Sequence, residues 1–273
     1  MTQRLNKILL FACLTTGMLF LFGCGEYQQI LKSKDPDLKF QKALMFFEAK
    51  QYVKSQTLLD EVTSFYRGTE RSEEILIYLS RSYMGQKDYT TAAEYYQAYI
   101  RNYPKGKHIV EARFQAGHCY YLNSPDARLD QTETKKAIEF FTQFIELYPT
   151  NPYVEQASKE MGEMYDKLAY KEYLSAKLYY NLGTYLGNNY LSAEITAKNA
   201  LKEYPTNKYQ EDLNWLILQS KYQQTINSID TKVEQRARET EDEYYNFITE
   251  YPNSKHIDSA HKIAKDIQKY LNE

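Results

Sequence analysis

The chain has 273 residues, 26% of them charged, and a formal net charge of −2 at pH 7. This near balance gives no support for a nucleic-acid partner, which would favour a strongly basic chain. Glycine (10) and proline (7) are scarce and tyrosine (28) is abundant, which favours long helices packed through large aromatic side chains.

The first 23 residues are expected to be a secretory signal peptide. Arg4 and Lys7 precede an apolar run from Ile8 to Phe22. This run is short for a membrane-spanning helix, which needs about 20 residues, and it has the length typical of a signal peptide. The tetrapeptide Leu21-Phe22-Gly23-Cys24 resembles the lipobox of bacterial lipoproteins. That resemblance implies cleavage before Cys24 and acylation of this cysteine, with palmitate among the lipids; an uncleaved anchor or a chance cysteine are the alternatives.

The cysteine expected to carry lipid also predicts where the chain is located. Two or more acyl chains anchor a protein stably, whereas one chain binds marginally. Gly25 follows the cysteine in place of Asp, which resembles lipoproteins sorted to the outer membrane of a Gram-negative bacterium, and no acidic run that would indicate surface export comes after it. We therefore expect residues 24–35 to be a lipid-anchored linker and the chain to face the periplasm.

From residue 36 onward, helical periodicity recurs in pairs. The first pair includes Ala43, Phe46, Tyr52 and Leu59. The second pair, residues 73–104, has the clearest pattern, and its side chains at helical spacing are Leu76, Leu79, Ser80 and Tyr83, then Tyr89, Ala92, Tyr96 and Tyr99. Residues 86–88 separate its two halves. A small residue such as Ala92 lets the second helix of a pair approach the first closely.

A ten-residue phrase marks the joint between successive pairs. It occurs as YPKGKHIVEA (103–112), YPTNPYVEQA (148–157), YPTNKYQEDL (204–213) and YPNSKHIDSA (251–260). The tyrosine is expected to end one helix and the proline to prevent its continuation. The residues expected to open the next helix are His108, Tyr153, Tyr209 and His256.

The later repeats depart from a regular spacing. Residues 123–132 are polar and contain Pro125, so they are expected to form an inserted loop. The long interval from Pro149 to Pro205 requires a helix that is lengthened or doubled. The last pair runs from about Gln210 to Pro252, and an amphipathic helix from Ser254 to Leu271 closes the array.

This order of helices resembles the tetratricopeptide repeat, with large apolar, Leu, small and Tyr positions on one helix and aromatic and Ala positions on the other. It predicts an all-α solenoid of about five helix pairs plus a C-terminal helix. We expect repeats 1–3 within residues 36–150, and repeats 4–5 with the closing helix within residues 151–273.

Nothing in the sequence indicates catalysis or metal binding. The motifs of nucleophilic hydrolases, zinc proteases and nucleotide-binding loops are absent. After the signal peptide is removed, the one other cysteine is Cys24, which is expected to carry lipid. We therefore expect Cys119 to be a buried apolar residue. His118 and His261 have no second His or Cys at ligand spacing. We therefore expect no enzyme activity, no cofactor and no metal, and we expect most tyrosines to fill the core.

Three stretches carry a closer resemblance, to the BamD family of outer-membrane lipoproteins. They are FQKALMFFEAKQYVKSQTLLDEVTSFYRG (40–68), DYTTAAEYYQAYIRNYP (88–104) and KLAYKEYLSAKLYYNLGTYLGNNYLSAEITAKNALKEYP (167–205). The third is the most specific, because a general tetratricopeptide consensus does not require it. The departures are Arg67 in place of the first turn proline, an extended loop at 187–189, and a more highly charged C-terminal helix.

The resemblance implies a role in the β-barrel assembly (BAM) complex. Such proteins bind the periplasmic domains of the barrel subunit BamA, together with other BAM subunits, and help to capture unfolded outer-membrane proteins. By this resemblance residues 36–122 would hold the client groove, with Tyr78, Arg81 and Arg113 as candidates. Residues 153–252 would dock BamA, and the candidates there are Lys171, Tyr180, Tyr185 and Lys198.

Two alternatives remain open at this stage. Another periplasmic repeat lipoprotein could be an adaptor for a pilus, a secretion channel or the cell-wall machinery. A glycan-binding outer-membrane lipoprotein could use tyrosines to stack on sugars, although such proteins usually have larger inserted loops than residues 123–132.

Overall fold

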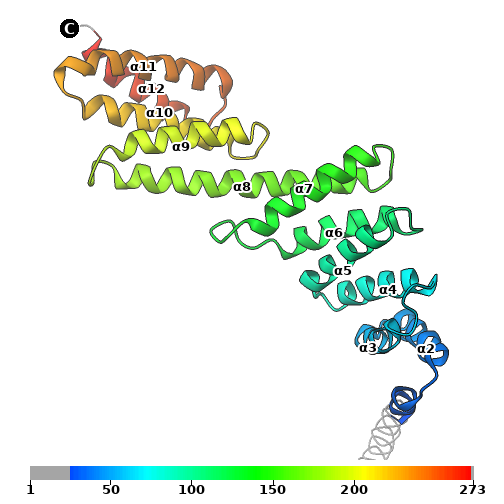
Figure 1. Ribbon diagram of the computed structural model, residues 1–273. Helices are drawn as coiled ribbons and strands as arrows, with labels where there is room; N and C mark the ends of the chain where they lie inside the picture. The colour runs from blue at the N-terminus through cyan, green and yellow to red at the C-terminus, as the bar shows by residue number, and fades with distance from the viewer. Residues whose placement is uncertain (1–24, 272–273) are drawn as a thin grey trace, which may run out of the picture. The chain divides into compact units, whose positions relative to one another are not determined.

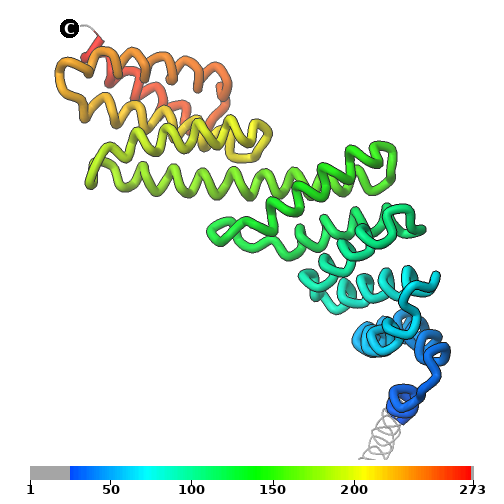
Figure 2. The backbone as a smooth tube through the Cα atoms, viewed as in Figure 1, coloured from blue at the N-terminus to red at the C-terminus, as the bar shows by residue number. Residues whose placement is uncertain are grey.

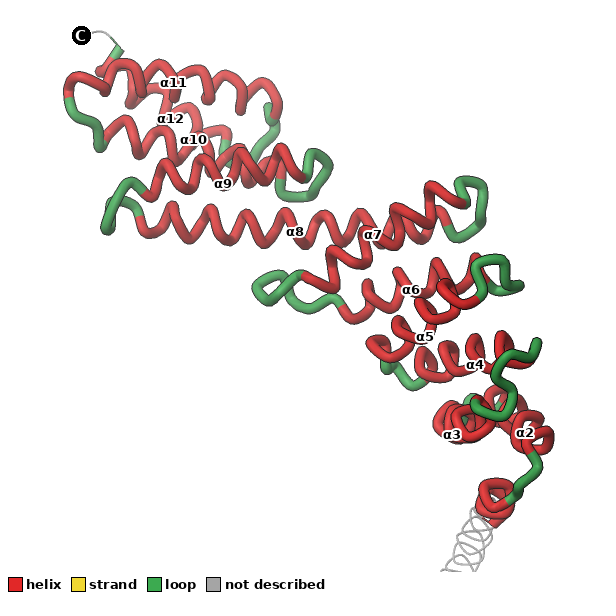
Figure 3. The backbone as a smooth tube through the Cα atoms, viewed as in Figure 1, coloured by secondary structure: helices red, strands yellow, loops and turns green. Residues whose placement is uncertain are grey.

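The computed structural model describes residues 25–271, so the expected signal peptide and Cys24 lie outside the described residues. Within that range the chain consists of helices and loops (Figure 3). It divides into two compact units, which meet between Asn123 and Ser124.

In the described part of the first unit, a helical segment at residues 25–32 precedes five helices that follow one another as neighbours (Figure 2). They are α2 (Pro36–Glu48), α3 (Tyr52–Thr63), α4 (Arg71–Gly85), α5 (Tyr89–Asn102) and α6 (Ile109–Asn123). Fully buried alanines lie where helices pack closely, among them Ala43 in α2 and Ala92 in α5. Large side chains such as Leu58, Tyr96 and Phe114 fill the remaining space between helices.

The second unit contains the remaining helices (Figure 1). They are α7 (Thr132–Leu147), α8 (Val154–Leu182), α9 (Asn189–Glu203), α10 (Gln210–Ile226), α11 (Asp230–Glu250), α12 (Ile257–Ile267) and the short 3₁₀ helix η1 (Gln268–Tyr270). Helix α8 is one continuous helix of 29 residues, so the long interval after Pro149 contains a lengthened helix and not a doubled one. The five predicted pairs and the closing helix are confirmed.

The repeated phrase forms the joints, as predicted. Tyr103, Tyr148, Tyr204 and Tyr251 are the residues that follow the last turn of α5, α7, α9 and α11. In each case the tyrosine N–H still donates to a carbonyl of the helix that it ends. The residue five places further on accepts the first hydrogen bond of the next helix, for example from Ala112 N to His108 O at 2.9 Å. The histidines of this phrase are therefore joint residues.

The division between the units differs from the predicted boundary at residue 150. Helix α7 and the loop before it belong to the second unit because they pack on α8. Ile138 of α7 packs against Leu168, and Lys167 Nζ donates to Ser124 Oγ at 2.6 Å. Residues 25–32, expected to be linker, are helical, because Ile30 is buried against the core that includes Phe40 and Leu58.

Candidate functional site

Two of the three residues predicted for the client groove are engaged within the first unit. The Tyr78 ring packs on Phe47 with ring centroids 5.0 Å apart, and the Arg81 guanidinium lies 5.3 Å from the Tyr78 ring centroid. Arg81 Nε also donates to Glu111 Oε1 at 2.6 Å, which raises the pKa of Arg81 and joins α4 to α6. Arg81 thus connects two successive repeats within the chain.

The third predicted groove residue, Arg113, is placed differently. Its side chain is partly buried on α6, and its Nε atom has no hydrogen-bond partner within the described part of the chain. The structure therefore groups Tyr78 with Arg81 and leaves Arg113 outside their contacts.

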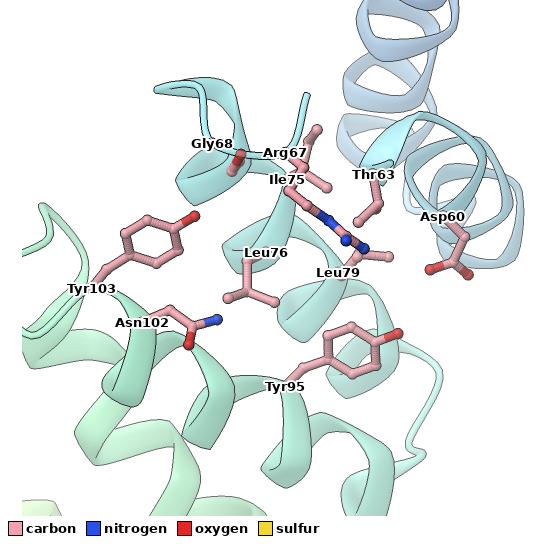
Figure 4. Close-up of a pocket in the computed structure, with 11 residues that line it drawn as sticks. Asp60, Thr63, Arg67, Gly68, Ile75, Leu76, Leu79, Tyr95, Asn102 and Tyr103 are labelled. Carbon is pink, nitrogen blue, oxygen red and sulfur yellow. The ribbon is translucent and has the colours of Figure 1, made fainter. Parts of the chain in front are cut away.

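A pocket of about 320 Å³ lies between α3, α4 and α5 (Figure 4). Ile75, Leu76 and Leu79 of α4 line it as an apolar floor. Arg67, the residue that stands in place of the first turn proline, extends into it from the loop between α3 and α4, with its guanidinium directed toward the side where Asp60 lies (Figure 4). Partial burial of the carboxyl group raises the pKa of Asp60. The pocket combines an apolar floor with one charge of each sign.

An exposed group of apolar side chains lies at one end of the second unit, where α8 ends and α9 begins. We call this group the apolar end; its members are Leu178, Leu182, Tyr185, Leu186, Leu191 and Ile195. The exposed fractions reach 90% for Leu186, 68% for Tyr185 and 59% for Leu178. The loop between α10 and α11, which carries exposed Ile229, lies at the same end of this unit (Figure 1). Large apolar side chains that are exposed together at one end of a unit favour a protein–protein contact there.

The loop of the apolar end is held in shape by its own hydrogen bonds. Asn189 N donates to Gly183 O at 3.0 Å, and Asn189 Nδ2 donates to Tyr185 O at 2.7 Å. Leu186 has φ of 54°, a left-handed conformation that is unfavourable for a side chain of this size. Strained and exposed positions of this kind occur preferentially at functional sites.

The four predicted docking residues have different environments. Tyr185 belongs to the apolar end. Tyr180 is partly buried on α8 and packs edge-on against Tyr190 at 5.5 Å between ring centroids. Lys198 is exposed on α9 and pairs with Glu194 at 2.7 Å. Lys171 lies near the start of the second unit, where its Nζ donates to Leu129 O at 2.6 Å.

Sequence reasoning missed the leucines and the isoleucine of the apolar end. The signal was available, because Leu178 and Leu182 are four residues apart, as are Leu191 and Ile195. Both pairs lie on helix faces away from the buried alanines Ala176 and Ala193. A four-residue spacing on the face opposite the core identifies an exposed apolar stripe.

Some classes of site have no counterpart among residues 25–271. No group of three or more His, Cys, Asp or Glu side chains there could hold a metal ion. Over the same range, no helix combines the length and the hydropathy needed to cross a membrane. Cys119 is a buried free thiol, and burial raises its pKa to about 12, so it lacks the thiolate character of a nucleophile.

The comparison with protein families identifies the class. A family described as YfiO, outer membrane lipoprotein, matches residues 32–188, which is more than half of the chain. The chain belongs to this family. Helices α2 to α8 and, from the apolar end, Leu178, Leu182, Tyr185 and Leu186 fall inside the matched segment.

Individual relatives are distant. A candidate outer membrane protein assembly factor BamD of Aquifex aeolicus (strain VF5) is 24% identical over 176 residues, which cover 64% of this chain. The match spans 58% of the length of that relative. Membership of the YfiO family and this relative together associate the chain with outer membrane protein assembly factors.

Two solved structures share a low overall similarity with this chain. The TPR2AB-domain:pHSP90 complex of yeast Sti1 has a TM-score of 0.37 and 13% identity, and the alignment covers 87% of this chain and 97% of that one. The apo form of RapI has a TM-score of 0.35 and 12% identity, over 90% and 88% of the two chains.

Proposed function

We propose that the chain is a non-enzymatic lipoprotein subunit of the outer-membrane β-barrel assembly machinery, anchored through lipid on Cys24 at the periplasmic face. Its family and the Aquifex relative support the association with outer-membrane assembly. The helix pairs supply stacked surfaces of the type that other repeat proteins use for binding.

The apolar end is the observation that carries this proposal. We assign to it the docking of the periplasmic domains of BamA, with Tyr185 and Leu186 at the centre of the contact. When a partner removes exposed leucine and tyrosine side chains from water, the free energy of the complex falls by about 25 cal/mol per Å² of apolar area. Burial in a partner would also explain why Leu186 is kept exposed in an unfavourable backbone conformation.

The first unit captures unfolded outer-membrane proteins in this proposal. The pocket between α3, α4 and α5 suits an apolar side chain of such a client, which would rest on Leu76 and Leu79. A client carboxylate would pair with Arg67, whose side chain extends into the pocket (Figure 4). Tyr78 and Arg81 would then position the repeats, since their contacts lie within the unit.

A mild-detergent purification of the full chain from its own membranes tests the docking proposal. We expect near-stoichiometric recovery of a barrel protein with periplasmic repeat domains. Leu182→Asp and Leu186→Asp should abolish this recovery. Leu147→Asp is the matched control, since Leu147 is also exposed but lies on α7, away from the apolar end. Recovery of a pilus, secretion, cell-wall or glycan-uptake partner in place of the barrel protein would overturn the proposal.

A further inference from the structure

A row of aromatic rings lies along one face of α8 in the second unit, separate from the apolar end. Tyr170 stacks on Tyr209 with centroids 4.8 Å apart, and Tyr173 lies 6.1 Å from Tyr209. All three rings are only partly buried. Tyr173 and Tyr209 pack against buried core residues on one side and leave part of each ring accessible.

Two pockets flank this trio of rings. Tyr170 and Tyr209 line a pocket of about 380 Å³ next to the loop at Ser124, and Tyr173 lines a second pocket of about 350 Å³ that also contains Trp215 and His256. The Trp215 and His256 rings stack in parallel, with centroids 4.6 Å apart and an angle of 4°. The two pockets are separate, with the trio between them, and their lining on α8 runs from Glu163 to Asn181. We call the two pockets and the trio together the α8 groove.

The α8 groove contains two lysines that have no carboxylate within ion-pair distance in the described chain. Lys177 Nζ lies 5.6 Å from the Tyr173 ring centroid. Lys167 Nζ donates to the carbonyl and hydroxyl oxygens of Ser124, and burial lowers its pKa although Asp126 and Glu163 oppose the shift.

The other two lysines of the groove are neutralised. Lys208 pairs with Asp166 at 2.9 Å and Lys255 pairs with Asp212 at 3.2 Å. Asp126 and Glu163 line the same pocket as Lys167 and act against the lowering of its pKa. The positive charge of the groove that faces no carboxylate is thus that of Lys177, next to the Tyr173 ring.

We propose that the α8 groove binds an extended peptide segment in which aromatic or aliphatic side chains alternate with acidic ones. The segment of α8 from Glu163 to Asn181 is about 27 Å long at 1.5 Å per residue, which matches about eight residues of extended chain at about 3.3 Å each. The rings of the trio and Trp215 contact the apolar side chains, and Lys177 pairs with a carboxylate of the peptide. This inference does not depend on which partner occupies the apolar end.

Trp215 makes the groove directly measurable, because it is the single tryptophan of the chain. The probe is an acetylated, amidated octapeptide of the sequence Phe-Ser-Phe-Glu-Phe-Ser-Phe-Glu, which contains no tyrosine or tryptophan. Added to the full chain in detergent micelles, it should change the Trp215 emission and saturate. Probes with Lys in place of Glu, or Ser in place of Phe, should bind at least about tenfold more weakly.

A pair of variants links the binding to the groove. Lys177→Gln should weaken binding of the acidic probe about tenfold, and added salt should weaken binding to the wild type in the same direction. Lys202→Gln on α9 is the matched control, because this lysine is exposed and does not line the groove. Circular dichroism and the melting temperature should be the same for both variants.

Three results would overturn the inference. They are an unchanged Trp215 emission with the acidic probe, equal binding of the lysine-substituted probe, and equal loss of affinity in Lys177→Gln and Lys202→Gln. Saturable binding of an anionic oligosaccharide such as oligogalacturonate, without binding of the peptide, would assign the groove to a glycan instead.

Discussion

Glu73 shows how a single side chain orders a joint between repeats. The Tyr99 hydroxyl donates to Glu73 Oε1, and Lys107 N donates to the same oxygen at 2.8 Å. His108 N in turn donates to the Tyr99 hydroxyl at 2.9 Å. Glu73 belongs to α4 and Tyr99 to α5, so this small network connects the first helix of a pair to the turn that leaves the second.

Gly106 is expected to be intolerant of a side chain because it lies against this network. An added Cβ would be 2.6 Å from both Glu73 Oε1 and the Tyr99 hydroxyl. Gly106→Ala should therefore lower the free energy of unfolding by about 1–3 kcal/mol, measured by urea denaturation. Gly162→Ala is the control: no atom would lie within 4 Å of its Cβ, and removing a helical glycine should stabilise by about 0.5–1 kcal/mol. Equal stabilities of the two variants would contradict the account of the joint.

Asp37 should contribute to the acid sensitivity of the first unit. The Tyr66 hydroxyl, which donates to Asp37 Oδ1 at 2.7 Å, and then Arg71, hold the pKa of Asp37 below its ordinary value of 3.8. Because its pKa is lowered, ionised Asp37 stabilises the folded state above pH 3.8. This stabilisation is lost as the pH falls through the folded-state pKa. Asp37→Asn should thus reduce the loss of thermal stability between about pH 5 and about pH 2.5. Melting temperatures that fall in parallel for wild type and variant would exclude this contribution.

At the scale of elements, sequence periodicity predicted the helix pairs well because the repeat requires particular residues at each position. Tyr103 and Pro104 are needed to end α5, and Ala92 is needed where helices approach. The boundary between units was less predictable: Lys167 and Ile138 contact partners that are distant in sequence and have no local pattern. The same is true of the α8 groove, because Tyr170 and Tyr209 come together only when α8 packs beside the start of α10.

The buried alanines of α9 are expected to be necessary for stability, because they lie where helices pack closely. Ala197 is fully buried in the cluster that includes Ala176 and Leu213. Ala197→Leu should lower the free energy of unfolding by about 1–3 kcal/mol through overpacking between α8, α9 and α10. Asn199→Leu, at an exposed position of the same helix, should change it by less than about 0.5 kcal/mol. Urea denaturation of both variants compares them directly, and a similar effect in each would remove the argument for close helix approach.

At the scale of the whole molecule, the two units offer different surfaces. The first has a pocket with an apolar floor and the charges of Asp60 and Arg67. The second has the apolar end and the α8 groove. A chain of this kind can hold one partner permanently while another surface exchanges its ligand, which suits a subunit of an assembly machine.

The docking of the apolar end is the central claim, and photo-crosslinking in living cells tests it most directly. A photoreactive amino acid replaces Leu186 in the full chain, and a second chain has it at Glu250, an exposed residue at the end of α11. The account predicts that the Leu186 position crosslinks to a barrel protein with periplasmic repeat domains and that the Glu250 position does not. Crosslinks from Leu186 only to lipid, or to a protein of another machinery, would contradict it.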